Sequence, residues 1–365
     1  MGKYSFLYIS THTGPAGGGI YCARLDYTNG EVTAFKKVAD LERAGIMTQY
    51  APKGYLYSVG IEGAMAENQG CIAAYTVDTN TGMLKRLNRQ QTGAGLPTFV
   101  AVSEDGCFVL QVSFSTAAAS VLQIKADGSL MRSGKVHRFE GRGTNPIRQT
   151  KAHPHCISMQ PIDHTVFVSD LGTDQITRFR LDEQQGEIVR DGHVQSSIHL
   201  GAGPRIMRFS NDGQYVYVVN ELQNTISVYS YNKDRRILEP VQVLSTLPHG
   251  VDSSFERQMA SEIRLHPNQK YVYVTNRSTG DGLVDGIAVF SRNIRSGELS
   301  LIQHCATGKH PRHFNIDPTG RWLFVSARDS DQIHRFHIDP DAGVLQEIGD
   351  PIDFPQPWDL QFYID

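Results

Sequence analysis

Arg205 and Glu221 stand at the two ends of GPRIMRFSNDGQYVYVVNE (203–221), a stretch typical of two short apolar strands joined by a turn. Both side chains are too polar for an ordinary core. In an antiparallel hairpin the second strand returns to the end where the first began, so we expect the two residues at one edge. A guanidinium and a carboxylate placed there form either a simple ion pair or part of a site for an anionic molecule.

The spacing of 16 residues recurs along the chain and links Thr98 to Phe114, His155 to Leu171 and Arg312 to Arg328. These positions are therefore expected around one opening. The full predicted set, with its neighbours, is His153, His155, Asp170, Arg205, Asn220, Glu221, Asn276, Arg277, Arg312, His313 and Arg328. Arginines, histidines and a carboxylate gathered at one mouth favour a pocket for a small anionic ligand, because an arginine fork matches carboxylate or phosphate.

Simpler roles remain open for several of these residues. Asp170 and Asn220 follow equivalent strands and equally suit the capping of a turn. Arg312 and Arg328 equally suit solvated rim charges. His153 and His155 resemble a metal pair, but no third ligand follows at a diagnostic spacing, so we predict neither a metal nor another cofactor.

A repeat of about fifty residues organises the elements that must position this set. Each unit pairs a strand of the VYVVN type with one of the ISVYSY type, and the units begin at Leu7, Leu56, Val109, Val166, Val216, Val272 and Leu323. Seven such units predict an all-β fold, a seven-bladed β-propeller with four-stranded antiparallel blades. We expect one domain over 1–365, with 63–70 and 249–259 as insertions.

The two ends of the chain predict how the ring closes. QPWDLQFYID at the C-terminus aligns with GPRIMRFSND, the first strand of a blade, whereas the N-terminus begins directly with a second strand, KYSFLYIST. The C-terminal segment is therefore expected to supply the inner strand of the N-terminal blade. This arrangement leaves no long sheet edge exposed.

Composition excludes several classes of protein. The 365 residues are 40% hydrophobic and carry a net charge of −3, so no overall basic field favours nucleic acid or membrane as a partner. Neither a membrane-spanning apolar run nor a signal peptide is evident, and we expect a cytoplasmic protein. The five cysteines are scattered and suggest neither a disulfide framework nor a zinc site. Motifs of serine hydrolases and nucleotide-binding enzymes are absent from the sequence.

The chain resembles the seven-bladed propeller lactonases of the 6-phosphogluconolactonase type, whose fold the fungal carboxymuconate cycloisomerases share. The most specific stretches are NPIRQTKAHPHCIS (145–158), GAGPRIMRFSNDGQYVYVVNELQNTISVY (201–229), ASEIRLHPNQKYVYVTNR (260–277) and HPRHFNIDPTGRWLFVSARDSD (310–331). The resemblance implies functional roles for His155, Arg205, Glu221 and Arg277. VSFST (112–116), Arg328 and GDGLVDG (280–286) depart from the family pattern near the mouth.

The implied reaction is hydrolysis of a sugar lactone, which needs an activated water and stabilisation of the oxyanion formed at the carbonyl. We expect Arg205 and Arg277 to hold the carbonyl oxygen and the anionic group of the substrate. His155 or Glu221 takes the proton from water. His155 is the preferred base, because arginines beside Glu221 keep the pKa of its carboxylate low.

Three alternatives compete with this reading. The same groups suit an enzyme that forms a lactone from a muconate-type diacid. A non-catalytic propeller that binds protein partners is a second alternative, disfavoured by the polar mouth and by having only two tryptophans. A metal-dependent lactonase is the third.

Overall fold

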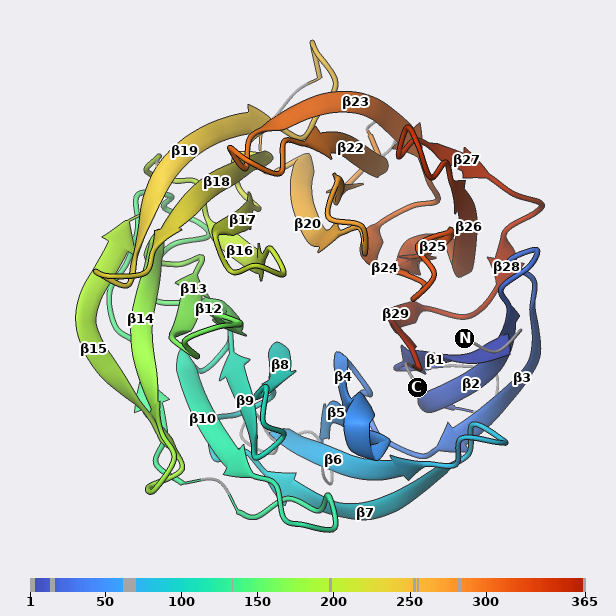
Figure 1. The fold of residues 1–365 in the computed structure, drawn as a ribbon, viewed down its shortest axis with the longest axis horizontal. Coiled ribbons are helices and arrows are strands. Elements are labelled where there is room, and N and C mark those ends of the chain that lie inside the picture. The colour runs from blue at the N-terminus through green and yellow to red at the C-terminus, as the bar shows by residue number, and fades with distance from the viewer. Residues whose placement is uncertain are drawn as a thin grey trace.

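The computed structural model describes residues 4–13, 17–61, 70–132, 134–196, 199–251, 254, 256–280 and 284–363. Seven antiparallel sheets are arranged radially around a central axis (Figure 1). Six sheets have four strands, and the seventh has an additional short strand. The predicted all-β seven-bladed propeller is therefore confirmed.

The innermost strand of each blade runs along the central channel (Figure 1). In ring order from the N-terminal blade, these strands are β29 (Pro357–Phe362), β4 (Met47–Tyr50), β8 (Phe99–Val102), β12 (Pro154–Met159), β16 (Pro204–Phe209), β20 (Gln258–Leu265) and β24 (Pro311–Ile316). We number blades 1 to 7 in this order. The second strands are β1 (Tyr4–Thr11), β5 (Tyr55–Ile61), β9 (Phe108–Ser113), β13 (Val166–Asp170), β17 (Tyr215–Asn220), β21 (Tyr271–Ser278) and β25 (Trp322–Ala327).

The third and fourth strands complete each blade outward. The third strands are β2 (Gly19–Asp26), β6 (Gly70–Val77), β10 (Ala118–Gln123), β14 (Gln175–Asp182), β18 (Thr225–Asn232), β22 (Gly286–Arg292) and β26 (Gln332–Ile338). The outer strands are β3 (Val32–Ala39), β7 (Leu84–Gln91), β11 (His137–Arg138), β15 (Glu187–Ser196), β19 (Ile237–Ser245), β23 (Leu299–Ala306), β27 (Leu345–Glu347) and β28 (Ile352–Asp353). Two short 3₁₀ turns, η1 (Ala51–Lys53) and η2 (Arg328–Ser330), follow β4 and β25.

Ring closure occurs as the sequence predicts. The C-terminal strand β29 pairs antiparallel with β1, with Leu7 opposite Phe362 and Ile9 opposite Leu360. Its other neighbours in blade 1 come from the N-terminus, in the order β29-β1-β2-β3. The two ends of the chain therefore share one sheet, which removes the edge that an open ring would leave.

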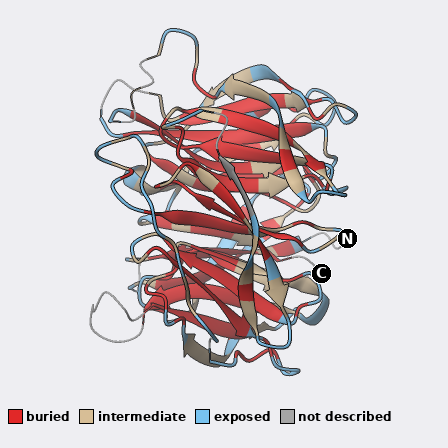
Figure 2. Ribbon diagram, turned by 90° about the vertical axis from the view of Figure 1, so that its left-hand side faces the viewer, coloured by how far each residue is buried: buried red, intermediate tan, exposed pale blue. Residues whose placement is uncertain are grey.

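The middle strands are buried on both faces, because each blade packs between two others (Figure 2). A tyrosine in four of the second strands donates its hydroxyl to a glycine carbonyl in the next blade's outer turn. These pairs are Tyr8–Gly82, Tyr57–Gly128, Tyr217–Gly297 and Tyr273–Gly343, at 2.8 to 3.0 Å. Gly297 has φ +73°, and a Cβ there would lie 2.1 Å from the Tyr215 ring, so this turn requires glycine.

Blade 6 differs from its expected boundaries. Gln258 and Met259 belong to β20, although the sequence suggested an insertion up to 259. Glu262 lies within this longer strand. A bulge between Ala260 and Ile263 accompanies the longer strand. Most of the expected 63–70 insertion lies outside the described residues.

Candidate active site

Glu221 is the centre of a buried charge cluster at one mouth of the channel. It follows β17, where its backbone N–H bonds the Gly203 carbonyl at 2.9 Å, so the residues flanking the hairpin do share one edge. Its carboxylate accepts hydrogen bonds from three guanidinium groups: Arg148 at 2.5 Å, Arg205 at 2.9 Å and Arg277 at 2.9 Å. The Glu221 side chain is 1% exposed. The pair that opened the sequence argument is thus part of a larger network.

Arg205 is the second residue of β16 and one of the largest fully buried side chains. Its Nε donates to Glu221, and its Nη1 donates to the Ser261 carbonyl at 2.6 Å. Two acceptors on different blades therefore fix the plane of the guanidinium. Burying an unpaired charge is costly, so both contacts stabilise the Arg205 guanidinium and fix its orientation.

Arg148 was not among the predicted site residues. It lies in the segment that leads into β12, where the Asn145 side chain accepts a hydrogen bond from the Arg148 backbone N–H at 2.9 Å. It stands within NPIRQTKAHPHCIS, one of the stretches that carry the family resemblance, and that was the available signal. Spacing missed it because Arg148 lies outside the strand-end positions of the repeat.

Arg277 belongs to β21 and joins Glu221 to a second pair of titratable side chains. Its Nη2 donates to Glu221, and its Nη1 lies 3.2 Å from Nε2 of His310. The His310 ring in turn lies 3.4 Å from the carboxylate of Asp329. Nε of Arg277 is buried and has no hydrogen-bond partner among the described residues.

The arginines determine how the cluster titrates. Burial alone would raise the pKa of Glu221, but Arg277, Arg205 and Arg148 hold it far below its usual value. Burial and the charge of Arg205 lower the pKa of His155 well below its usual value. At neutral pH Glu221 is therefore ionised and His155 is neutral.

A cavity of about 200 Å³ opens beside this cluster. Four of the predicted residues line it: His155, Arg205, Arg312 and His313. Thr98 and Phe114, which the spacing of 16 residues placed around the same opening, also line it, whereas the sequence argument missed His12, Arg43 and Trp358. His12 stacks on Trp358 at 4.3 Å between ring centroids.

His153 and His155 are separated by one residue in the sequence but differ in their surroundings. His155 lines the cavity edge-on to Phe114, and its Nδ1 is buried without a partner among the described residues. His153 stacks on Phe114 at 4.0 Å, and its Nδ1 lies 2.9 Å from the Phe114 carbonyl. Across the described part of the chain, no group of three or more His, Cys, Asp or Glu side chains is arranged to hold a metal.

Arg312 and Arg328 share one aromatic ring. Their guanidinium carbons lie 4.4 Å and 5.9 Å from the centre of the Trp358 ring. Arg328 pairs with Asp329 through two hydrogen bonds, of 2.6 and 3.1 Å. Nε of Arg312 is buried without a partner, and no carboxylate of the described residues pairs with this arginine. Arg312 is thus a cation at the cavity wall that lacks a counter-charge.

Three of the predicted residues make hydrogen bonds to neighbouring strands and loops. The Asp170 carboxylate accepts from the backbone N–H groups of His153 and Gly172, at 2.7 and 2.9 Å. Asn220 donates to Thr225 and Ser227 within blade 5. Asn276 and Thr246 exchange two hydrogen bonds of 2.7 Å. The capping role left open for Asp170 and Asn220 is the one their contacts support.

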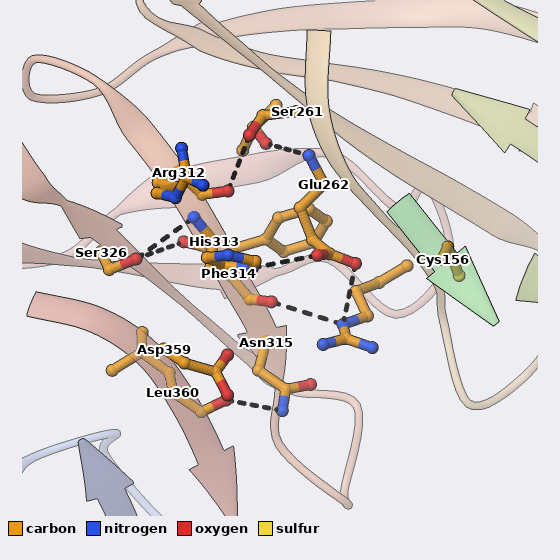
Figure 3. A network of polar contacts seen from close by, with 12 residues as sticks. Cys156, Ser261, Glu262, Arg312, His313, Phe314, Asn315, Ser326, Asp359 and Leu360 are labelled. Carbon is orange, nitrogen blue, oxygen red and sulfur yellow. Dashed lines mark hydrogen bonds and ion pairs between the residues drawn. The ribbon is translucent and has the colours of Figure 1, made fainter. Parts of the chain in front are cut away.

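His313 connects the cavity to a second charged group deeper in the channel. Its Nδ1 lies 3.0 Å from Oε2 of Glu262 (Figure 3). Oε1 of Glu262 accepts from Arg208 at 2.8 Å. Glu262 and Arg208 line a further cavity of about 240 Å³ that His313 does not line. The sequence argument chose His313 but gave Glu262 no role.

The fold and the candidate site together define a closed β-propeller with an arginine-rich polar pocket at one mouth. The chain matches the family model described as "Lactonase, 7-bladed beta-propeller" over residues 6–362, and it belongs to that family. It is 30% identical to 6-phosphogluconolactonase of Bacillus subtilis, with 97% of each chain covered. It is also 30% identical to that of Formosa agariphila, over 91% of this chain and 92% of the relative.

A solved structure supports the same assignment. The periplasmic gluconolactonase of Pseudomonas aeruginosa superposes with a TM-score of 0.88 at 25% identity, covering 98% of this chain and 99% of that one. The prediction of a lactonase is confirmed at the level of the family. Within the described ranges no helix is long and apolar enough to cross a membrane. The cytoplasmic location stays a prediction.

Proposed function

We propose that the cavity hydrolyses the ester of a sugar lactone that carries an anionic group. The observation that supports this most strongly is an imbalance of charge. Two further arginines lie beside the three that bind Glu221, and in the described residues only two carboxylates pair with any of these five. The arginines are Arg148, Arg205, Arg277, Arg312 and Arg328, and the carboxylates are Glu221 and Asp329. A phosphorylated aldonolactone, the substrate class implied by relatives named 6-phosphogluconolactonase, offers the missing negative charge.

Arg205 is the proposed ligand of the lactone carbonyl oxygen. It lines the cavity, and Glu221 and the Ser261 carbonyl fix its orientation before substrate arrives. A preorganised cation stabilises the oxyanion of the tetrahedral intermediate without reorganising during the reaction. Arg277, expected to share this role, contacts Glu221 from behind, so we propose that it acts by holding Glu221 in place.

The anionic group of the substrate is proposed to bind Arg312. This guanidinium lines the cavity without a carboxylate partner and lies over Trp358. A phosphate or carboxylate would supply the acceptor that the buried Nε lacks. Arg328 on the same ring adds positive charge at this end of the site.

A histidine is better suited than Glu221 to accept the proton of the attacking water. Three arginines occupy the Glu221 oxygens and hold the pKa of the carboxylate far below its usual value, after allowing for burial. A carboxylate so stabilised is a weak base. His155, the base that the sequence favours, lines the cavity as a neutral imidazole, and His313 is a second imidazole on the same cavity.

The test is acid release on a panel of aldonolactones with and without phosphate, followed with a pH indicator and corrected for spontaneous hydrolysis. Wild-type protein is compared with Arg205→Ala, His155→Ala and, as a matched surface control, Arg235→Ala, whose side chain is 70% exposed. We expect a loss of about 10²–10³ for Arg205→Ala, as for removal of an oxyanion donor. A wild-type protein that opens no lactone would overturn the proposal.

Muconate lactonisation is the second candidate, since arginines for two carboxylates suit the same cavity. Adding muconolactones and muconate-type diacids to the panel separates the two reactions. Turnover of the diacids with no turnover of aldonolactones would favour lactonisation.

A further inference from the structure

We propose that His313, oriented by Glu262, is the general base that takes the proton from the attacking water. This inference rests on the proposed lactone hydrolysis and assigns a residue to one of its steps. His313 lies on β24 of blade 7 and His155 on β12 of blade 4, and both line the same cavity. The two imidazoles differ in the partner of Nδ1: His313 contacts a carboxylate there, whereas Nδ1 of His155 has no partner among the described residues.

The Glu262 carboxylate fixes the His313 ring. Nδ1 of His313 lies 3.0 Å from Oε2 of Glu262, and the two side chains are 3% and 0% exposed. Burial alone would raise the pKa of Glu262, but Arg264, Arg208 and the hydrogen bond from His313 hold it well below its usual value. An ionised carboxylate only accepts hydrogen bonds, so Nδ1 must carry the proton. Nε2 therefore presents a lone pair.

Both members of the pair are anchored from behind. The hydroxyl of Ser326 bonds the His313 backbone at its N–H and its carbonyl, at 3.3 and 2.8 Å (Figure 3). The Glu262 backbone N–H donates to the Thr275 hydroxyl at 3.0 Å, and the carboxylate accepts from Arg208 at 2.8 Å. The ring therefore cannot turn to exchange its two nitrogens without breaking the Glu262 contact.

Nε2 of His313 is free to act. No hydrogen bond to another described residue occupies this nitrogen, and His313 lines the cavity together with Arg205 and Arg312. Burial lowers the pKa of His313 to about 4, with Arg312 and Arg205 lowering it and Glu262 raising it. The imidazole is therefore neutral at pH 7, and Glu262 is the neighbour that favours its protonation.

Protonation costs less at His313 than at His155. Arginines on three elements surround His155, and the carboxylate that favours its protonation, Glu221, already bonds three arginines. A proton on His155 would therefore add a cation to an arginine cluster. A proton on His313 would instead create an ion pair with Glu262 at 3.0 Å. An imidazolium that forms against a carboxylate is the arrangement that general-base histidines use.

The proposed step balances as follows. One O–H bond of water breaks, its proton moves to Nε2 of His313, and the oxygen bonds to the lactone carbonyl carbon. The resulting oxyanion faces Arg205. The bond between that carbon and the ring oxygen then breaks, and the ring oxygen takes the proton back from Nε2. The product is the open hydroxy acid, and His313 is neutral again.

The test combines activity with chemical rescue. His313→Ala is expected to lower kcat by about 10²–10⁴, the usual contribution of a general base, with a much smaller change in KM. Added imidazole should restore part of the activity of His313→Ala, since the deleted ring leaves space beside the substrate. The matched control is His334→Ala, because His334 also pairs with a carboxylate, Glu347 at 2.6 Å, in the same blade but away from the cavity. It should keep wild-type kcat.

Glu262→Gln tests the positioning role. Glu262 raises the pKa of His313, whereas Arg312 and Arg205 lower it. Loss of the Glu262 charge should therefore lower this pKa and move the acidic limb of the kcat/KM profile to lower pH. A limb that stays in place assigns Glu262 a structural role only. Nitrogen-15 NMR of labelled histidine adds a readout that needs no turnover, and a His313 ring protonated at Nε2 would overturn the inference.

The outcomes separate the two proposals. Rescue of His155→Ala by imidazole, with unchanged kcat in His313→Ala, would overturn the role of His313 and leave lactone hydrolysis standing. A wild-type protein inactive on every lactone would overturn both.

Discussion

Glu221→Gln is the most informative perturbation of the charge cluster. The substitution keeps the shape of the side chain but removes the charge that three guanidinium groups share, at 2.5 to 2.9 Å. Arg205 and Arg277 are 1% and 7% exposed, so water cannot replace the lost partner. Breaking a buried ion pair from one side costs about 3–5 kcal/mol, because it leaves a buried charge uncompensated. We expect a loss of unfolding free energy in that range.

Urea unfolding at pH 7 measures this loss, and Glu239→Gln provides the matched control. Glu239 pairs with Arg235 at 3.8 Å on the surface, where the two side chains are 46% and 70% exposed, so its loss should stay below about 1 kcal/mol. Equal losses in the two variants would refute the reasoning.

The difference in unfolding free energy between wild type and Glu221→Gln should depend on pH. The pKa of Glu221 in the folded protein lies far below its usual value of about 4.3, because Arg277, Arg205 and Arg148 outweigh burial. Its stabilisation is therefore complete above pH 4.3 and is lost as the pH falls toward the folded pKa. The gap between wild type and Glu221→Gln should be constant from pH 6 to 8 and narrow below pH 4. A gap that widens in acid would contradict the assignment of charge.

Two further substitutions test other parts of the channel. Arg148→Met should cost about 1.5–3 kcal/mol through loss of its bond to Glu221, and it should cost much less in the Glu221→Gln background, as a double-mutant cycle in urea would show. Burial raises the pKa of Asp359 to about 7, so ionising this carboxylate destabilises the fold as the pH rises from about 4 through 7. Asp359→Asn should therefore gain stability over wild type at pH 8, by at most about 4 kcal/mol for three pKa units, and by only about 1.5 kcal/mol at pH 5, about one pKa unit above the usual value; equal differences between the two proteins at both pH values would contradict this.

Most of the fold could be predicted from the sequence repeat. Strand alternation and the fifty-residue period predicted seven blades, and the mismatch between the two ends of the chain predicted that β29 pairs with β1. A strand boundary was predicted wrongly where a bulge extended the strand. Blade 6 begins at Gln258 for this reason, and the shift places Glu262 inside the channel wall.

The site was predictable where it follows the repeat and unpredictable elsewhere. Arg205, Arg312, His155 and His313 occupy equivalent places near the start of inner strands, and all four line the cavity. Arg148 lies in a segment that belongs to no blade strand, so spacing could not select it. His12 and Trp358 come from the two ends of the chain, and only ring closure brings them together.

The way charge is distributed along the channel gives each carboxylate a different task. Glu221 is saturated by three arginines, so it is suited to holding Arg205 and unsuited to exchanging a proton. Glu262 also contacts arginine, yet one of its oxygens faces His313, whose other nitrogen is open to the cavity. A cation that appears on His313 during a reaction is therefore compensated, whereas Arg312 and Arg205 supply compensation for an anion. Attack of water on a lactone forms both charges at once, a cation on the base and an oxyanion at the carbonyl. The cavity has a compensating group for each of them.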